Sequence, residues 1–455
     1  MPIRDRLDIV DILTLPAPLS RRNYKWEAVL PNRVFPGDLP EEIWTFSPDY
    51  GSGLAGEGVE RLFSDLFPGI SNRARTGQRQ ALMAALLALV QCSRATTGRQ
   101  SIGFLHERTT RSFKEPARYK VCDYGKRPFT EALDTLAKAG LVKCHKGFRD
   151  KEAPLGVSSL WLPGTQLNEW LAACGELSVI TFRPVRETLI LRDGSRVPLD
   201  YQDGEETRAM RDRIEAANAL REHLEWTYVP LVDDRQYVEA DARTTIHGAS
   251  LRCHRVFRED FRSGGRFYCG AQGLRKAERA TIQVNGKSTI ELDYKSLHPR
   301  LLYNAEGLAA PDDCYASNSR SRDLTKLISL LCINCDSKKQ AERALRSNWP
   351  MNSEEASFHL DGYLAEHPAI AHRLFQSGWK RLQYLDSQLV DKVLAAGCYR
   401  DIAILPVHDS FIVDTQWAPW LKDKVGQAYR DITGFEGVID WEPMPDMSEF
   451  DWLDR

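Results

Sequence analysis

The chain has 455 residues, of which 42% are hydrophobic and 27% charged, and its formal net charge is −2. This balance excludes an intrinsically disordered chain, and the length predicts two or three domains instead of one core. No apolar run is long enough for a membrane span, and the first twenty residues carry early charges in place of an apolar signal core. We therefore expect a cytoplasmic protein with no membrane partner.

The N-terminal part of the chain begins with a Pro- and Gly-rich segment, continues with a predicted helix and ends with a basic segment. Residues 1–70 are rich in Pro and Gly, which predicts an irregular arm with short elements. The Ala- and Leu-rich stretch Gln78–Cys92 predicts a helix. From Arg94 to Lys151 there are 14 Lys plus Arg against 6 Asp plus Glu, a local net charge of +8. Such a stretch is typical of a phosphate-binding surface, although a solvated basic face has the same composition.

A short helix and two strands follow within the basic stretch. Phe129–Ala139 has apolar residues at helical spacing, and Gly140 ends it at a C′ position. Leu141–Lys143 and Ser158–Leu162 are strand candidates on either side of a charged loop. This order resembles a winged-helix domain over residues 71–175, whose recognition helix would lie in a major groove. A small α+β module for packing or protein contact is the alternative.

The next segment, Asp203–Trp226, predicts a charged helix with few large apolar positions. It indicates a thumb-like helical region over residues 176–250, or an exposed linker helix. The acidic pair at its start, Asp203 and Glu205, opens a polar helix and does not end a buried strand, so we expect no proofreading exonuclease. Further on, Cys332 and Cys335 lie in an apolar helical stretch, which favours small core residues over a metal site.

Two aspartates lie next to predicted strands in the C-terminal half. Ser288–Tyr303 predicts a strand that ends at Asp293 and is followed by a helix. Ile402–Asp414 predicts a β-hairpin with His408 and Asp409 at its tip. A carboxylate between buried strands is costly unless it has a partner. Brought together, the two aspartates could hold two Mg²⁺ ions, one activating a 3′-hydroxyl and one steadying the leaving pyrophosphate.

A basic helix is predicted between these two segments, over Ser321–Asn334. Arg322 and Lys326 are four residues apart, so they share one helix face, and Leu330 lies one turn further. Such a face suits the charges of a triphosphate. Taken alone, the same spacing is usual on a solvated helix face.

Along the chain, a strand-end aspartate is followed by a basic helix and then by a His-Asp hairpin. In this order of motifs the sequence resembles family A DNA polymerases and the related single-subunit phage-type RNA polymerases. The resemblance extends over roughly Gly264–Val413. It implies a right-hand polymerase of class α+β, with the palm and compact fingers over residues 251–455. The winged-helix-like domain would deliver this polymerase to DNA.

The resemblance also implies roles for single residues. Asp293 and Asp409 match the metal-binding catalytic aspartates, and Lys326 matches the triphosphate ligand and candidate general acid of the fingers helix. Arg322 matches a ligand of the nucleotide, and His408 matches the histidine that contacts the primer end. Arg266 matches a contact to the minor groove of the primer–template, and Gln383 matches a contact to the template.

Four positions depart from the family pattern. His298, five residues after Asp293, stands where the family carries a glutamate that selects the sugar, and it can still act as a steric gate. Leu330 replaces the aromatic residue that stacks on the nucleotide, and Asn334 replaces a tyrosine of the fingers helix. The sequence around Ser410 resembles the RNA polymerase form of the hairpin. The sugar therefore stays open, with deoxynucleotides favoured.

The sequence is interpreted as a DNA polymerase without an exonuclease, of the kind that mobile elements and phages carry. It would add dNTPs to the 3′-hydroxyl of a DNA primer-template with two Mg²⁺ ions, for which Mn²⁺ can substitute. Three alternatives stay open: an RNA polymerase or primase that takes NTPs, a replication initiator with a degenerate palm, and a template-independent transferase.

Overall fold

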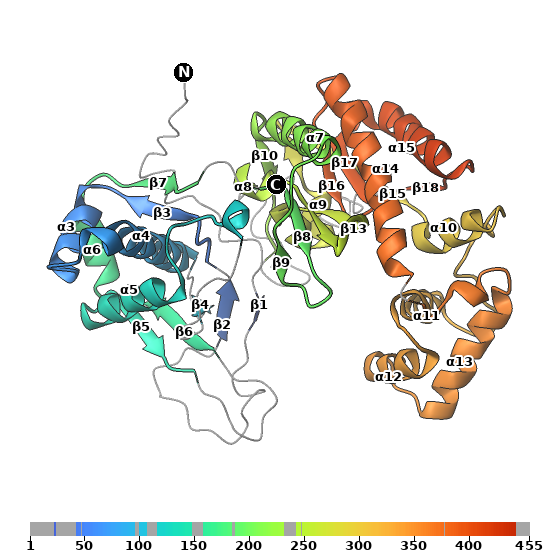
Figure 1. Ribbon diagram of the computed structural model, residues 1–455, viewed down its shortest axis with the longest axis horizontal. Coiled ribbons are helices and arrows are strands. Elements are labelled where there is room, and N and C mark those ends of the chain that lie inside the picture. The colour runs from blue at the N-terminus through green and yellow to red at the C-terminus, as the bar shows by residue number, and fades with distance from the viewer. Residues whose placement is uncertain are drawn as a thin grey trace, which may run out of the picture. The chain divides into compact units, whose positions relative to one another are not determined.

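The fold is known from a computed structural model, in which the chain divides into two compact units, Met1–Glu187 and Thr188–Arg455. The boundary lies inside the predicted thumb-like region, 176–250. Each unit is described below by itself (Figure 1). The structure describes residues 22–23, 42–46, 48–95, 100–106, 116–147, 158–183, 187–231, 243–246, 248–376 and 378–442.

The N-terminal unit combines helices with two sheets. One sheet has the strand order β1-β2-β4-β6-β5, and the other pairs β3 with β7. The strands are β1 Arg22–Asn23, β2 Glu42–Phe46, β3 Ser52–Ala55, β4 Gln100–His106, β5 Val142–His145, β6 Ser159–Pro163 and β7 Ser178–Thr181. The helices are α3 Glu57–Leu66, α4 Asn72–Ala95, α5 Lys126–Lys138 and α6 Leu167–Ala173, with a 3₁₀ turn at Ala117–Tyr119.

The core of this unit is built around α4. Every residue of α4 from Ala81 to Val90 is buried, because the helix contacts strands on one side and α5 on another. The predicted arm, 1–70, is wrong for its last part: Val59 and Phe63 of α3 are buried in the same core. Gly56 joins β3 to α3 with a φ of 156°, a conformation that a side chain rarely adopts.

The elements predicted for a winged helix are present at nearly the predicted positions. Helix α5 is followed by Gly140 at a φ of 74°, as expected for a C′ glycine, and β5 pairs with β6 in antiparallel register. The tip of the predicted wing, 148–157, lies outside the described residues. The winged-helix arrangement itself stays a prediction.

The C-terminal unit contains two sheets, mostly antiparallel. The larger has the order β11-β10-β14-β15-β17-β16 with β18 also paired to β15, and the smaller has the order β13-β12-β8-β9. The strands are β8 Leu189–Arg192, β9 Pro198–Leu199, β10 Trp226–Tyr228, β11 Thr244–Thr245, β12 His254–Arg258, β13 Asp260–Tyr268, β14 Gln283–Val284, β15 Lys287–Tyr294, β16 Leu405–Val407, β17 Ser410–Asp414 and β18 Ile439–Glu442.

The helices of this unit fall into two groups. Helices α11, α12 and α13 contact one another, whereas α14 packs along β13 and against α7 and α15 (Figure 1). The α-helices are α7 Glu205–Glu222, α8 Gly248–Leu251, α9 Lys276–Ala280, α10 Leu297–Ala305, α11 Arg322–Asn334, α12 Lys338–Asn348, α13 Ser353–Glu366, α14 Trp379–Tyr399 and α15 Ala418–Thr433. Short 3₁₀ turns lie at Gly270–Gly273, Ala371–Arg373 and Thr415–Trp417.

Helix α7 corrects the interpretation of its segment. It is no exposed linker helix, because Arg221 is 1% exposed and donates to the carbonyl oxygens of Leu251 (3.0 Å) and Ile404 (2.9 Å). The region 176–250 is not purely helical either, since β8 pairs with β12 and β10 with β14. The buried face of α7 combines three apolar residues with three polar ones, so its apolar pattern is weak; these residues are Thr207, Met210, Ile214, Ala217, Asn218 and Arg221.

The apolar helical segments are used inside the protein. No helix in the described part of the chain has both the length and the apolar character that a bilayer crossing demands. In α11, Cys332 is fully buried and Cys335 is 6% exposed, and both thiols are free. They are small core residues, as the sequence predicted.

Candidate active site

The strand register brings the two predicted metal ligands together. Asp293 lies near the end of β15 and pairs with Ser410 of β17, so Asp409, the residue before Ser410, lies at the same edge of the sheet. On β15 the neighbours Leu292 and Tyr294 are buried in the core, and Asp293 between them is half-buried on the opposite face. The predicted pairing of a strand-end aspartate with a hairpin aspartate is present.

The hairpin between β16 and β17 has a two-residue turn, His408 and Asp409. Val407 pairs with Ser410, which closes the turn, and His408 has a φ of 58°. A non-glycine residue in this left-handed region costs roughly 1 kcal/mol or more and persists only when its surroundings hold it. The turn leaves His408 exposed and Asp409 half-buried at the sheet edge.

The charges around Asp409 make its ionisation harder. Burial raises the pKa of Asp409, and the nearby carboxylate of Asp386 raises it further, while His298 and Arg266 act in the opposite direction. A cation bound by Asp409 would therefore favour the ionised form of this carboxylate.

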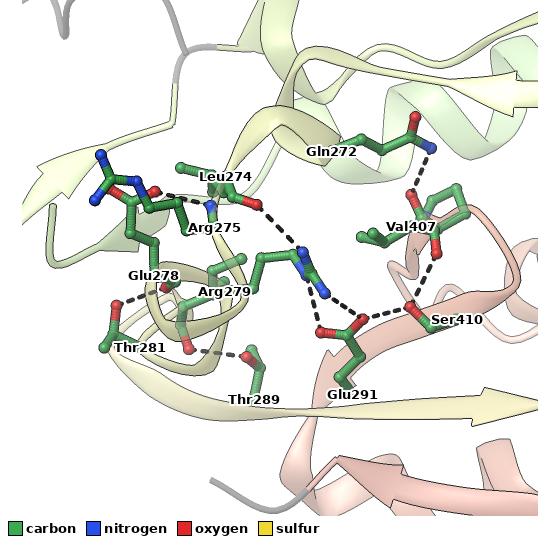
Figure 2. Close-up of polar contacts among 12 residues, drawn as sticks. Gln272, Leu274, Arg275, Glu278, Arg279, Thr281, Thr289, Glu291, Val407 and Ser410 are labelled. Atoms are coloured by element: carbon green, nitrogen blue, oxygen red, sulfur yellow. Dashed lines mark hydrogen bonds and ion pairs between the residues drawn. The ribbon is translucent and has the colours of Figure 1, made fainter. Parts of the chain in front are cut away.

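A second acidic side chain of β15 is already neutralised (Figure 2). Glu291 accepts hydrogen bonds from Arg279, at 3.0 Å from Nε and 3.2 Å from Nη2, and it also contacts the hydroxyl of Ser410. Arg279 is held in turn by the carbonyl of Leu274 at 3.2 Å. Glu291 therefore orders the hairpin through Ser410 and is not available as a further metal ligand.

Two glycines direct Arg266 toward the site. Gly264 and Gly265 have φ values of 74° and 80° in β13, where the pairing with β12 shifts register. A Cβ on Gly265 would come within 2.5 Å of the Phe257 ring, so no side chain fits there. The irregularity turns Arg266 toward α14, where its Nε donates to Oδ2 of Asp386 at 2.6 Å.

His298 joins this arrangement from α10. Its Nε2 accepts from Nη2 of Arg266 at 3.0 Å and lies 3.7 Å from Oδ2 of Asp386. The sequence did not single out Asp386. It named Gln383, one turn earlier on α14 and half-buried, whose role stays a prediction. No sequence pattern distinguishes Asp386, since only the fold shows that Arg266 and His298 meet it.

The predicted nucleotide-binding residues form one exposed face of α11. Helix α11 begins after Ser321, whose side chain accepts from the backbone N–H of Leu324, and it buries Ile328 and Cys332 on its inner face. The opposite face is exposed along its whole length, and its residues are Arg322, Lys326, Leu330 and Asn334.

The start of α11 lies near the aspartates, through Tyr315. Arg322 contacts Asp313 and lies over the Tyr315 ring, 5.3 Å from its centroid. Burial raises the pKa of Tyr315 to about 12, and the charge of Asp409 contributes to this rise. The sequence analysis did not name Tyr315. For Lys326, Leu330 and Asn334 the structure gives the exposed face and no contact with the aspartates.

The donor set fits Mg²⁺. Mg²⁺ is usually bound by one or two carboxylates together with substrate phosphates and waters. Asp293 and Asp409 would supply the two carboxylates, and exposed Asp440 of β18 pairs with Asp293 on the other side. In the described ranges, no group of three or more His, Cys, Asp and Glu side chains could hold a metal ion. Any ion here would therefore depend on the substrate for further ligands.

Comparisons with known proteins identify no relative of this chain by sequence. No protein-family model matches it, and no curated protein matches it. Among solved structures it is similar to the POL domain of Pol1 from M. smegmatis in complex with DNA primer-template and dNTP. The sequence identity is 11% and the TM-score is 0.29, over 86% of this chain and 66% of that one. The chain thus spans slightly less than two thirds of that polymerase chain.

Proposed function

We propose that this chain is a template-directed nucleotidyltransferase, a DNA polymerase without proofreading that adds dNTPs to a primer 3′-hydroxyl. The observation that supports this most is the pairing of β15 with β17, which places Asp293 and Asp409 at one edge of the sheet. Two Mg²⁺ ions, or Mn²⁺, bound there would activate the 3′-hydroxyl and stabilise the leaving pyrophosphate.

The remaining residues have binding and positioning roles in this proposal. Arg322 and Lys326 attract the triphosphate from the exposed face of α11, with Lys326 as the candidate general acid. Leu330 and Asn334 extend this face and contact the base or sugar of the nucleotide. His408, Gln383 and Arg266 contact the primer and the template. None of these steps requires a residue outside the C-terminal unit.

His298 is the proposed sugar gate. Its imidazole is only 15% exposed and is held by Arg266, so it offers a fixed wall to the ribose. A 2′-hydroxyl against this wall would clash or displace the ring. An RNA polymerase or primase is the second candidate, favoured by Ser410, which replaces an acidic residue in the hairpin.

The N-terminal unit is proposed to bind duplex DNA. Helix α5 exposes Arg127 and Lys138, and its exposed Glu131 pairs with Arg127. The wider chain around it has a local charge of +8 between Arg94 and Lys151. Cationic side chains bind the DNA backbone irrespective of its sequence.

The test is extension of a labelled primer on a DNA template with Mg²⁺, comparing dNTPs with NTPs and including a lane without primer. We expect extension with dNTPs in the presence of the primer. Product from NTPs without a primer would assign the chain to the primases or RNA polymerases. A protein that binds the duplex and makes no product would be an initiator with a degenerate palm.

A further inference from the structure

We infer that Asp386 of α14 is a positioning residue for sugar selection, acting through His298 and Arg266. This inference rests on the proposed function, in which His298 is the sugar gate. It adds a residue that touches neither the nucleotide nor a metal ion and that fixes the orientation of the gate.

Asp386 meets both partners with one oxygen atom. Its Oδ2 accepts from Nε of Arg266 at 2.6 Å and lies 3.7 Å from Nε2 of His298. Nη2 of the same arginine donates to the imidazole at 3.0 Å. In this triangle of carboxylate, guanidinium and imidazole, across α14, β13 and α10, Arg266 donates to both of the other groups, so Asp386 restricts the imidazole through the arginine.

Burial separates the roles of the three residues. The side chain of Asp386 is 1% exposed, whereas those of Arg266 and His298 are 21% and 15% exposed. Only the arginine and the histidine can therefore reach a substrate. Asp386 is buried beneath them and contacts almost no solvent, as expected for a residue that orients its neighbours.

The arrangement is costly for a residue that only stabilises the fold. Burial alone would raise the pKa of Asp386, yet His298 and Arg266 together hold that pKa below its ordinary value, so the carboxylate stays ionised. Its Oδ1 is buried and has no hydrogen-bond partner among the described residues. A buried acceptor without a partner is unfavourable, so an aspartate at this position has a cost that an apolar residue would not have.

A second ion pair on the same helix offers a matched control. Asp391, five residues further along α14, accepts from Arg213 at 3.0 Å and 2.7 Å and does not contact His298. Its side chain is 11% exposed. Replacing Asp391 by Asn therefore removes a comparable charge from α14 without disturbing the triangle.

The test is a double-mutant cycle on the preference for dNTPs over NTPs, with Asp386→Asn, His298→Ala and the double variant, and with Asp391→Asn as the control. We expect Asp386→Asn to lower the ratio of dNTP to NTP incorporation about tenfold. The double variant should match His298→Ala within about twofold, because residues that act as a unit are not additive. Asp391→Asn should leave the ratio unchanged.

An unchanged ratio in Asp386→Asn, or effects of the two single changes that multiply in the double variant, would overturn the inference. A readout without turnover separates this failure from failure of the proposed function. We expect diethyl pyrocarbonate to modify His298 several-fold faster in Asp386→Asn than in the unchanged protein or in Asp391→Asn. Equal modification rates would show that Asp386 does not hold the ring. Faster modification without primer extension would contradict the polymerase and leave the positioning intact.

Discussion

The two longest helices of the described residues, α4 in the N-terminal unit and α14 in the C-terminal unit, differ in the kind of side chain that they bury. From Ala81 to Val90, α4 buries ten consecutive apolar residues. Helix α14 buries Asp386, Ser387 and Asp391 together with its apolar side chains. The polar side chain that α4 buries, Gln78, is uncharged and donates to the carbonyl of Pro128 at 3.0 Å, whereas α14 buries charges that need partners from β13, α10 and α7.

Buried charged side chains are thus found on α14 and not on the buried stretch of α4. A buried ion pair rarely stabilises a protein more than an apolar replacement would, so its presence favours a role in specificity or function. Asp386 lies behind the proposed nucleotide site, whereas nothing similar is described around α4. The buried charge of α14 is therefore consistent with the proposed placement of the chemistry in the C-terminal unit.

The largest expected effect is the loss of activity when the aspartate pair is broken. Asp409→Ala should lower nucleotide addition by about a thousandfold or more, since it removes a metal ligand at the reacting atoms. The midpoint of thermal unfolding should change little. Asp414→Asn at the far end of β17 is the control and should remain active. Turnover close to that of the unchanged protein in Asp409→Ala would remove the two-metal assignment.

Loss of a buried side chain should destabilise each unit for a different reason. Leu86→Ala in α4 should cost about 2 to 5 kcal/mol through the cavity it leaves. In the C-terminal unit, fully buried Arg255 of β12 donates to Ser387 of α14 and to the carbonyl of Gly265 in β13, both at 2.8 Å. Arg255→Ala should cost roughly 3 to 5 kcal/mol, because it leaves these polar partners unsatisfied. Hydrogen exchange at increasing urea concentration measures both changes, with peptides that contain fully buried Trp161 and fully buried Trp226 as reporters of the two units. Equal effects on both reporters would mean that the units unfold as one.

Replacing His298 by a smaller residue tests whether the C-terminal unit selects the sugar of the nucleotide. His298→Ala should raise ribonucleotide incorporation about tenfold relative to deoxynucleotides, since the half-buried ring no longer excludes the 2′-hydroxyl. Competition between dNTPs and NTPs on one primer-template measures the ratio. If the ratio did not move, another side chain would select the sugar.

The elements that carry the candidate residues could be predicted from the sequence, because they depend on local patterns. An apolar run followed by a helix predicted that Asp293 ends a strand, two apolar runs predicted the hairpin at Asp409, and helical spacing predicted that Arg322, Lys326 and Leu330 share one face of α11. Asp386 could not be predicted, since an aspartate on a helix usually faces solvent and its partners are 120 and 88 residues away in sequence.

The fold was harder to predict where polar residues are buried or where turns are dense. Arg221 and Asn218 gave α7 the pattern of a solvated helix, although both are buried. The Pro and Gly content of residues 1–70 concealed β3 and α3. In both cases the decisive contacts are long-range and leave no local signature.

Removing the N-terminal unit tests its proposed role in binding duplex DNA. Without residues 1–187 the protein should bind duplex DNA several-fold more weakly, and the dependence of its affinity on salt should become less steep, because fewer phosphates are neutralised. Fluorescence anisotropy at several salt concentrations measures this. Nucleotide addition at saturating DNA is the control and should persist. Equal salt dependence in the two proteins would contradict a DNA-binding role of this unit.

The smallest expected effect is stabilisation by the metal alone. At a Mg²⁺ concentration ten times its Kd, binding should stabilise the C-terminal unit by about 1.4 kcal/mol, which raises its Tm by roughly 2 to 4 °C. Differential scanning fluorimetry with and without Mg²⁺ measures the shift. Asp293→Asn should abolish it. A shift of the same size in that variant would place the ion elsewhere.

The central claim is that the chain copies a template, and addition of a single nucleotide tests it most directly. Four primer-templates that differ only in the next template base are each given the four dNTPs one at a time, with Mg²⁺. We predict that each primer is extended by the complementary dNTP and not by the other three. Extension irrespective of the template base would make the protein a template-independent transferase, and no extension with any dNTP would contradict the account.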